Sequence, residues 1–237
     1  MKRVTNKIIS MISGNTMEIM GKAGITNSEI QNKTLISASA EINSCTISGN
    51  VRIGDFCRIY DSTIIAHAPV TIGKNTSIFG PNTDIYNLHN EVKIGNFCSI
   101  ARNVSMQEYN HIHERITSYF IFRNVFKEKS IINDTSSKGK IEIGNDVWIG
   151  THCVILSGIK IGDGAVVASN SVVSENIPPY TIAAGSPAKV IKYRFSEEII
   201  QELLNLEWWK WNHDRIKRNR NLFEGALDMK KIKNIIP

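Results

Sequence analysis

An aliphatic residue recurs at every sixth position over long stretches of this chain. A period of six matches neither the 3.6-residue repeat of an α-helix nor the two-residue alternation of a single strand. It predicts a short strand followed by a corner, repeated many times, with the aliphatic side chain pointing inward. The positions in step are Ile143, Ile149, Ile155, Ile161, Val167 and Val173; Leu88, Ile94, Ile100 and Met106; Ile47, Ile53, Ile59 and Ile65; and, after a slip of one residue, Ile72 and Ile78.

The residues between the aliphatic positions fit the same interpretation. Glycine often follows the aliphatic residue, and Asn or Asp stands near the corner, where a left-handed or tight backbone is needed. The fifth position is often small, as a narrow interior requires, and the cysteines there are expected to pack as small hydrophobic side chains. These small residues are Cys57, Cys98, Cys153 and Ala165. The chain is therefore predicted to be all-β, a parallel β-helix of triangular section with three hexads per turn.

The repeat also divides the chain into parts. We expect a lead segment over residues 1–34, the β-helix over 35–194, and a helix with a basic tail over 195–237. Within the β-helix the period disappears over 107–139, which is too long for a simple corner and predicts a protruding arm. The first half of this arm, "YNHIHERITSYF" (109–120), holds the densest cluster of titratable side chains.

The C-terminal segment changes to a helical period. Ser196 is placed to cap a helix, and an aliphatic stripe follows it. The tryptophans after the stripe allow two interpretations, a stacking platform for nucleic-acid bases or, as we expect, packing against the coil or a neighbouring subunit. The tail after Lys217 is expected to be loosely held. The stripe is Ile199, Ile200, Leu203, Leu204 and Leu206, and the tryptophans are Trp208, Trp209 and Trp211.

Composition restricts the partners more than the fold. There are 28 Lys and Arg against 22 Asp and Glu, a net charge of +6; this excess suits an anionic ligand such as a phosphorylated cofactor, suits nucleic acid, or only aids solubility. No apolar run is long enough to span a membrane, and polar residues interrupt the N-terminal stretch, which argues against a secretory signal. The cysteines lie far apart without metal-ligand spacing, which is typical of reduced thiols in the cytoplasm. They are Cys45, Cys57, Cys98 and Cys153.

Several motifs occur in a fixed order: "IGNFCSIARNVSM", an Asn-His pair, a Ser-Tyr-Phe segment, "IGNDVWIGTHCVI", "IPPYTIAAGSPAKVIKYRF" and "LLNLEWWKW". Over residues 70–212 the chain thereby resembles the xenobiotic acetyltransferase branch of the hexapeptide-repeat acyltransferases. That branch includes streptogramin and chloramphenicol acetyltransferases and many sugar O-acetyltransferases. The resemblance implies a left-handed β-helix, acetyl-CoA as the co-substrate, and a homotrimer with its active sites between subunits.

Acetyl transfer needs a base for the proton of the acceptor, donors for the oxyanion and a place for coenzyme A. Histidine suits the base because its unperturbed pKa lies near physiological pH. By resemblance the family's Asn-His pair falls on Asn110 and His111, which makes His111 the expected base and His113 the second choice. Glu114 either orients a histidine or pairs with Arg115, and the sequence leaves this open.

The resemblance carries further site residues onto this chain. Trp148 is expected to flank the pantetheine arm or the adenine of coenzyme A, or else it simply covers an edge of the coil. Three hydroxyl side chains are expected to contact the cofactor, namely Thr151, Ser169 and Ser174. Lys189 and Lys192 match basic positions near its phosphates, although each also fits a solvated edge. The residues expected to bind the acceptor are Asn82, Tyr86, Asn87 and Asn110.

The acceptor itself is less constrained. The arm departs from the antibiotic-inactivating enzymes by an added Arg-Ile, and extra coils precede residue 80; we therefore expect a hydroxyl of a sugar in a surface polysaccharide or its precursor. The alternatives are an antibiotic-inactivating acetyltransferase, a non-catalytic glycan-binding or structural solenoid, and a metal-dependent hydratase resembling γ-carbonic anhydrases. In the last, zinc would be held by His89, His111 and His113. We expect no metal, no nucleic-acid partner and no membrane span.

Overall fold

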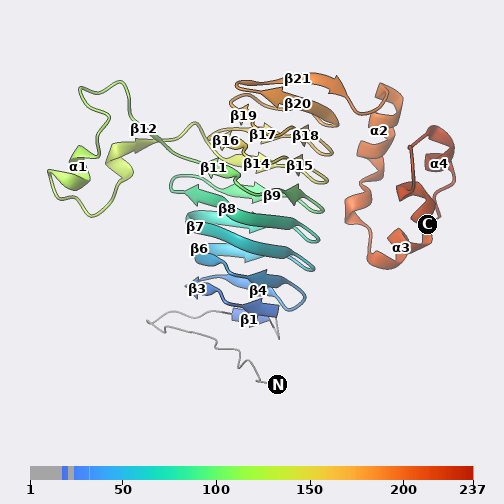
Figure 1. Ribbon diagram of the computed structural model, residues 1–237, viewed down its shortest axis with the longest axis horizontal. Coiled ribbons are helices and arrows are strands. Elements are labelled where there is room, and N and C mark those ends of the chain that lie inside the picture. The colour runs from blue at the N-terminus through green and yellow to red at the C-terminus, as the bar shows by residue number, and fades with distance from the viewer. Residues whose placement is uncertain (1–17, 21–23, 32, 237) are drawn as a thin grey trace.

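The computed structural model describes residues 18–20, 24–31 and 33–236, and in them short parallel strands stack into a single coil (Figure 1). The first face stacks β2 (Gly24–Thr26), β5 (Glu41–Asn43), the start of β7 (Arg58–Ile72), the start of β8 (Ser77–Asn87), β10 (Ser99–Ile100), β15 (Trp148–Ile149), β18 (Val166–Val167) and β20 (Thr181–Gly185).

The other two faces are built in the same way. The second face stacks β3 (Glu29–Gln31), the start of β6 (Thr46–Ile53), the middle of β7, the end of β8, β11 (Ser105–Gln107), β16 (Val154–Leu156) and β19 (Val172–Val173). The third face stacks β1 (Glu18–Met20), β4 (Leu35–Ser37), the ends of β6 and β7, β9 (Val92–Ile94), β14 (Ile141–Ile143) and β17 (Lys160–Ile161). The predicted left-handed β-helix of triangular section is confirmed.

The coil is filled by the aliphatic residues that the period of six identifies. The uninterrupted run from Ile143 to Val173 is at most 1% exposed at every predicted position. Two predicted positions are wrong, because Ile65 and Leu88 are only half-buried while Ile64 and Ile85 take the inward places. The register pairs Ile64 with Ile85. At both positions the spacing from the preceding inward residue is not six, because the corner before it is irregular, and the period shifts locally.

The cysteine side chains fill the narrow interior at the corners, as predicted. Cys57, Cys98 and Cys153 are at most 1% exposed, and none of the chain's four cysteines is paired in a disulfide. The Cys98 thiol donates to the carbonyl of Gly144, one coil above, with an Sγ–O distance of 3.1 Å. Burial raises the pKa of the Cys57 thiol to about 11, which keeps it protonated and suits packing rather than nucleophilic chemistry.

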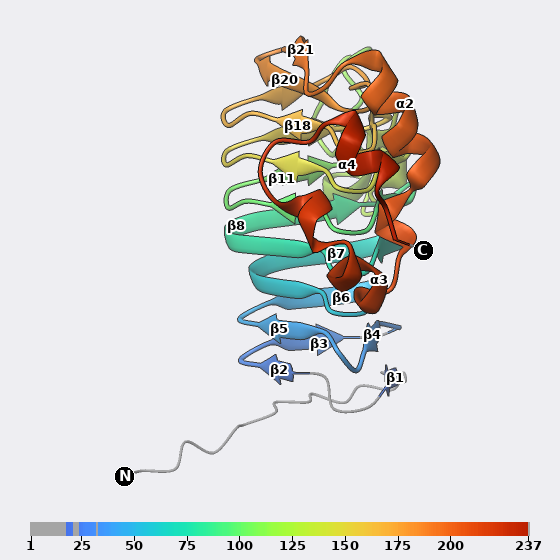
Figure 2. The same cartoon turned by 90° about the vertical axis from the view of Figure 1, so that its right-hand side faces the viewer.

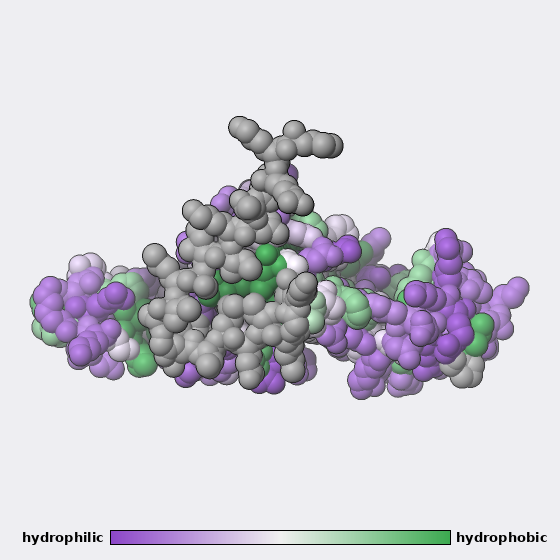
Figure 3. Space-filling model, turned by 90° about the horizontal axis from the view of Figure 1, so that it is seen from below, coloured by the Kyte–Doolittle hydropathy of each residue, from purple (hydrophilic) through white to green (hydrophobic). Residues whose placement is uncertain are grey.

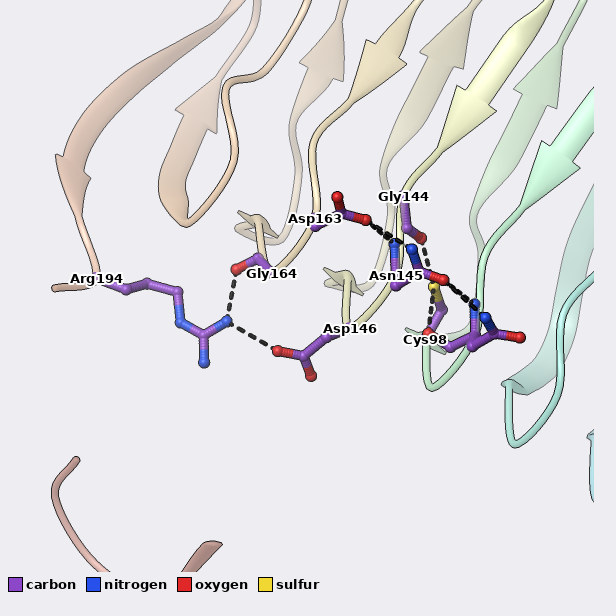
Figure 4. A network of polar contacts seen from close by, with 8 residues as sticks. Cys98, Gly144, Asn145, Asp146, Asp163, Gly164 and Arg194 are labelled. Atoms are coloured by element: carbon purple, nitrogen blue, oxygen red, sulfur yellow. Dashed lines mark hydrogen bonds and ion pairs between the residues drawn. The ribbon is translucent and has the colours of Figure 1, made fainter. Parts of the chain in front are cut away.

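The first corner, which joins the third face to the first, turns on residues with a left-handed backbone. Side-chain amides and carboxylates link successive turns there: Asn145 accepts from the Asn96 backbone at 2.8 Å, and Asp163 accepts from the Asn145 backbone at 2.7 Å (Figure 4). The residues with positive φ at this corner are Phe56, Asn75, Phe97, Asp146, Gly164 and Tyr180. The Asn and Asp spacing of the sequence therefore has a structural cause.

The coil begins earlier than the boundary expected at residue 35. Strands β1, β2 and β3 pair in parallel with β4, β5 and β6, so they are the lowest coil rungs. Residues 1–17 of the expected lead segment lie outside the described residues. At the other end, β21 (Ala188–Tyr193) pairs antiparallel with β20 and closes the coil.

The C-terminal module (residues 195–236) covers the first corner (Figure 2). Trp209 and Trp211 are 2% and 5% exposed, and the ring of Trp208 lies 4.8 Å from that of Phe97 on the coil. Packing against the coil is thus confirmed, and the interpretation as a nucleic-acid platform is wrong. The module comprises α2 (Glu197–Leu206), η2 (Trp208–Lys210), α3 (His213–Arg218), η3 (Arg220–Phe223) and α4 (Met229–Lys233).

Two details of this module differ from expectation. Ser196 stands at the N-cap of α2, but its hydroxyl makes no capping hydrogen bond, and only its carbonyl accepts from Ile200. The tail after Lys217 is not a loose strand of chain, because it contains η3 and α4. Asn219, 3% exposed, holds it by accepting from and donating to the backbone of Ile236.

The arm (residues 107–139) leaves the coil on the side opposite the C-terminal module (Figure 1). Seen from below, hydrophilic residues cover much of both projections, with hydrophobic residues visible at the coil between them (Figure 3). The arm contains β12 (Asn110–His111), α1 (Ile121–Asn124), η1 (Ile132–Asp134) and β13 (Thr135–Ser136).

Candidate active site

The arm starts from the third corner, which joins the second face to the third, and is anchored by a buried carboxylate. Glu108 is 0% exposed and accepts hydrogen bonds from the backbone N–H groups of Leu88 and His89, both at 2.9 Å. Its other oxygen accepts from Asn90 Nδ2 at 2.8 Å and from Ser137 Oγ at 2.5 Å. Burial alone would raise the pKa of Glu108, but these hydrogen bonds together hold it below its usual value.

His111 lies three residues beyond this anchor, exposed on the long-looped hairpin that the antiparallel strands β12 and β13 form. Its Nδ1 lies 2.6 Å from the carbonyl oxygen of Ser118. Because a carbonyl only accepts, Nδ1 carries the proton, and Nε2 of the neutral ring keeps a free lone pair. The rings of His111 and Phe120 pack edge to face with their centroids 4.4 Å apart, and this contact restricts the plane of the imidazole. The ring is therefore oriented as a general base requires.

The neighbours of His111 do not reach it. His113 Nε2 lies 3.6 Å from a carboxylate oxygen of Glu114, and both side chains are mostly exposed. Arg115 instead donates to the carbonyl of Asn133 at 2.5 Å and lies over the ring of Phe122. Glu114 therefore lies beside His113 and away from Arg115, while Arg115 joins the two halves of the arm.

Two residues expected to bind the acceptor are occupied within the protein. Asn110 donates through Nδ2 to the hydroxyl of Ser157 on the coil at 2.7 Å. Asn87 is 1% exposed, and its Nδ2 donates to carbonyls of Ala68, Pro69 and Asn90. Both side chains bind within the third corner. Asn87 is thereby buried away from solvent, whereas Asn110 is half-buried.

The other two expected acceptor residues line an open hollow of about 430 Å³ on the lower coil. Asn82 lies at the second corner, which joins the first face to the second, and Tyr86 lies on the second face. Asp84 accepts there from the hydroxyl of Ser105 at 2.8 Å. The remaining lining residues are mostly hydroxyl side chains, namely Ser44, Thr46, Ser62, Thr63 and Thr83, with Asp61 and Pro81.

The residues expected to bind coenzyme A flank a column of small side chains on the first face. In each turn of the coil, one residue directly follows the inward-pointing aliphatic residue of the first face. The strand register stacks these residues from four successive turns on one another, and none of the four has a side chain larger than a methyl group. A Cβ added to Gly150 would lie 2.7 Å from the backbone nitrogen of Ser169, so the turns are in close contact there. The column is Ala101, Gly150, Ala168 and Ala184. Trp148, 56% exposed, stands on one side of it, and Thr151 and Ser169 stand at the second corner on the other.

The remaining cofactor candidates are more dispersed. Lys189 and Lys192 are exposed on β21 at the end of the coil, where Lys189 pairs with Glu175 at 2.5 Å. Ser174 follows β19 and therefore lies at the third corner, a different corner from Thr151 and Ser169. The structure thus groups Trp148, Thr151 and Ser169 but separates Ser174 from them.

The three histidines considered for zinc are engaged separately. His89 Nε2 lies 2.9 Å from the hydroxyl of Thr135, which itself donates to the carbonyl of Ile131, so His89 donates and offers no lone pair at Nε2. Among residues 18–20, 24–31 and 33–236, no three His, Cys, Asp or Glu side chains are grouped so that they could hold a metal ion. None of the helices within these ranges has the length and apolar character needed to cross a membrane.

Three features of the site were not identified from the sequence. The small-residue column had a partial signal, because Gly150 and Ala168 directly follow inward aliphatic residues that stand three hexads apart, Ile149 and Val167. Glu108 and the carbonyl of Ser118 had none, because both act through contacts made only when the arm folds back on the coil.

Comparison with known proteins agrees with this architecture. The family model for the bacterial transferase hexapeptide (six repeats) matches residues 140–175. A probable macrolide acetyltransferase from Lysinibacillus sphaericus is 42% identical over 148 residues, which cover 60% of this chain and 81% of the relative. A chloramphenicol acetyltransferase from Morganella morganii is 44% identical over 129 residues, which cover 52% of this chain and 61% of that protein.

Solved structures are similar at a lower level. The polySia-specific acetyltransferase NeuO is 26% identical with a TM-score of 0.44, covering 73% of this chain and 81% of that one. A mutant of AntD, an N-acyltransferase from Bacillus cereus, in complex with dTDP and coenzyme A, is 25% identical with a TM-score of 0.47, covering 76% and 91%. These TM-scores are too low to carry an argument about this chain. The sequence relatives together with the coil do carry one: the chain belongs to the hexapeptide-repeat acyltransferases and is an acetyltransferase.

Proposed function

We propose that this protein transfers acetyl from acetyl-CoA to a hydroxyl of a sugar in a surface polysaccharide or its precursor, with His111 as the general base. The observation that carries the proposal is the contact of Nδ1 with the Ser118 carbonyl, because it leaves the Nε2 lone pair free on an exposed, oriented ring. Nε2 takes the proton of the acceptor hydroxyl while its oxygen attacks the thioester carbonyl. When the carbon–sulfur bond breaks, the imidazolium returns the proton to the thiolate.

The small-residue column is the proposed path of coenzyme A. A pantetheine arm is a thin chain with two amide groups, so it suits a shallow track of small side chains where the backbone lies close to it, walled by Trp148 on one side and Thr151 and Ser169 on the other. Lys192 and Lys189 at the end of the coil are the proposed partners of the cofactor phosphates. Lys189 would have to leave Glu175 to take part.

A complete site needs a second copy of the chain in this proposal. His111 projects from the third corner, whereas the small-residue column follows the first face, on the far side of the second corner. We therefore propose a homotrimer in which the arm of one subunit reaches the column of the next. The arm carries large exposed apolar side chains that such contact would cover, namely Ile116, Tyr119, Val125, Phe126 and Ile132. Cytoplasmic localisation is proposed from the four unpaired cysteines.

The acceptor is proposed from the polar hollow beside Asn82 and Tyr86. Its hydroxyl, carboxylate and amide side chains suit a ligand rich in hydroxyl groups better than an apolar one. The second candidate is an antibiotic hydroxyl, which is favoured by the names of the sequence relatives as macrolide and chloramphenicol acetyltransferases. A panel of oligosaccharides, nucleotide sugars, a macrolide, a streptogramin and chloramphenicol, assayed by thiol release from acetyl-CoA, separates the two.

The base is tested by His111→Ala with the best acceptor of that panel. We expect kcat to fall by roughly 10²- to 10⁴-fold, as removal of a general base usually does, while the dissociation constant of acetyl-CoA stays unchanged. His113→Ala, on the same exposed stretch, is the matched control and should retain activity. A fully active His111→Ala variant would remove His111 from the mechanism.

The cofactor path is tested by Ala168→Leu. The longer side chain would occupy the column, so we expect KM for acetyl-CoA to rise at least about tenfold while the melting temperature stays near that of the wild type. Val166→Leu, two residues earlier and outside the column, is the control. Equal KM values for Ala168→Leu and the wild type would place coenzyme A elsewhere.

A further inference from the structure

Glu108 makes more hydrogen bonds than the coil alone requires. Three of its four donors belong to one turn of the coil, namely the backbone N–H groups of Leu88 and His89 and the side-chain Nδ2 of Asn90. The fourth donor, Ser137 Oγ, belongs to the end of the arm. Four donors converging on one buried point need a group that only accepts, and an ionised carboxylate is such a group.

The carboxylate therefore joins three pieces of chain. Glu108 itself stands on the outgoing leg of the arm, three residues before His111, and Ser137 stands on the returning leg. Between these legs His111 is paired with Thr135 in the hairpin of β12 and β13. The ring of His89, at 2.9 Å from the Thr135 hydroxyl, adds a second connection from the same turn to the same hairpin.

The turn one coil below shows that this corner does not need a charge. There the neutral amide of Asn87 donates to the carbonyls of Ala68 and Pro69, each at 3.0 Å. A buried carboxylate is costly to desolvate, so its presence at the next turn calls for a task specific to that turn. The two turns differ in the backbone groups that they present, carbonyls of Ala68 and Pro69 below and N–H groups of Leu88 and His89 above. They differ also in the arm, because only the upper turn is joined through its carboxylate to Ser137.

We propose that Glu108 is a positioning residue for His111, holding both legs of the arm at one point of the coil so that the imidazole is presented at a fixed place. Glu108 does not touch the reacting atoms. The inference rests on the proposed function, in which His111 is the base.

The first test is Glu108→Gln, which keeps the size of the side chain but puts an amide nitrogen where two donors already point. We expect kcat to fall about tenfold, because a small displacement of a catalytic group is enough for such a loss, while KM for acetyl-CoA stays within about twofold. The matched control is Glu128→Gln, on the same arm, where the carboxylate accepts from Asn133 Nδ2; its kcat should equal that of the wild type. Ser137→Ala removes only the bond to the returning leg and should give a smaller fall of the same kind.

A double-mutant cycle separates positioning from general stability. In a His111→Ala background there is no base to position, so Glu108→Gln should cause no further loss of the residual rate. The same tenfold loss in both backgrounds would overturn the proposal and make Glu108 a purely structural residue. If Glu108→Gln melts well below the wild type, the cycle is run with Ser137→Ala, and the same two outcomes decide.

Failure of this inference is distinguishable from failure of the proposed function. Full activity of His111→Ala contradicts the assigned base. An inactive His111→Ala variant, combined with unchanged kcat in both Glu108→Gln and Ser137→Ala, contradicts only the positioning role.

Discussion

The arm and the C-terminal module are both attached to the side of the same coil, but different forces hold them. The module packs aromatic rings on the first corner, with Trp208 against Phe97 and Trp209 almost fully buried. The arm is held by buried polar groups, with Glu108 at its root and Asp134, 3% exposed, further out. Apolar packing is strong but not directional, whereas a hydrogen-bonded carboxylate fixes the angle and distance of each donor.

This difference corresponds to what each attachment has to do. A module that only covers a corner tolerates small shifts of its helices, so packing suffices. An arm that presents a base cannot tolerate such shifts. We therefore expect damage to the module to reduce stability, and damage to the arm to reduce turnover with little change in the melting temperature of the coil.

The largest effect is expected from Trp209→Ala. Removing a buried indole should lower the free energy of unfolding by about 3–5 kcal/mol, measured by denaturant titration. Trp148→Ala is the matched control for stability, because Trp148 is 56% exposed and its loss leaves no cavity. A loss below about 1 kcal/mol for Trp209→Ala would mean that aromatic packing does not hold the module.

A smaller and local effect is expected from Asp134→Ala. The carboxylate of Asp134 accepts from the backbone N–H groups of Phe122 and Arg123, both at 2.9 Å, and the loss of a hydrogen bond to a charged group costs about 1.5–3 kcal/mol. We expect faster limited proteolysis between residues 107 and 139 and a lower kcat. An unchanged cleavage rate within the arm, or a large fall of the melting temperature of the whole protein, would contradict the separate behaviour of arm and coil.

The smallest effect concerns Asp146, a polar residue beneath the aromatic module. Burial raises the pKa of Asp146 to about 6 although Arg194 Nη1, 3.4 Å away, acts in the opposite direction (Figure 4). Since this pKa lies above the unfolded value of about 4, the folded state binds the proton more tightly, and stability should fall as pH rises from about 4 to 6.

Asp146→Asn tests this sign. We expect the variant to be more stable than the wild type at pH 7 by at most about 3 kcal/mol, because each pKa unit corresponds to about 1.4 kcal/mol and solvent at the 28% exposed side chain of Asp146 lowers the value. The pH dependence of its melting temperature between 4 and 6 should be flatter. A variant less stable than the wild type at pH 7 would mean that the ion pair with Arg194 outweighs the cost of burying the charge.

Prediction from sequence succeeded where the rule is local. Each hexad builds its own strand and corner, so the period of six identified the coil, the inward aliphatics and the buried cysteines. It failed at Ile65 and Leu88, because an irregular corner shifts the frame without leaving a composition signal. Prediction of the site was also uneven. Trp148, Thr151 and Ser169 lie together because the strand register brings them together. Asn87 and Asn110, which were expected to bind the acceptor, instead form hydrogen bonds within the protein.

The sequence by itself determined that this chain forms a hexad coil interrupted once, and that the interruption carries His111. This follows because hydrophobic periodicity is a property of neighbouring residues and needs no distant partner. Only the tertiary structure decided which nitrogen of His111 is free and what fixes the arm. The Ser118 carbonyl and the Glu108 carboxylate act at positions that depend on how a segment of irregular backbone folds back on the coil, and no repeat in the sequence encodes that path.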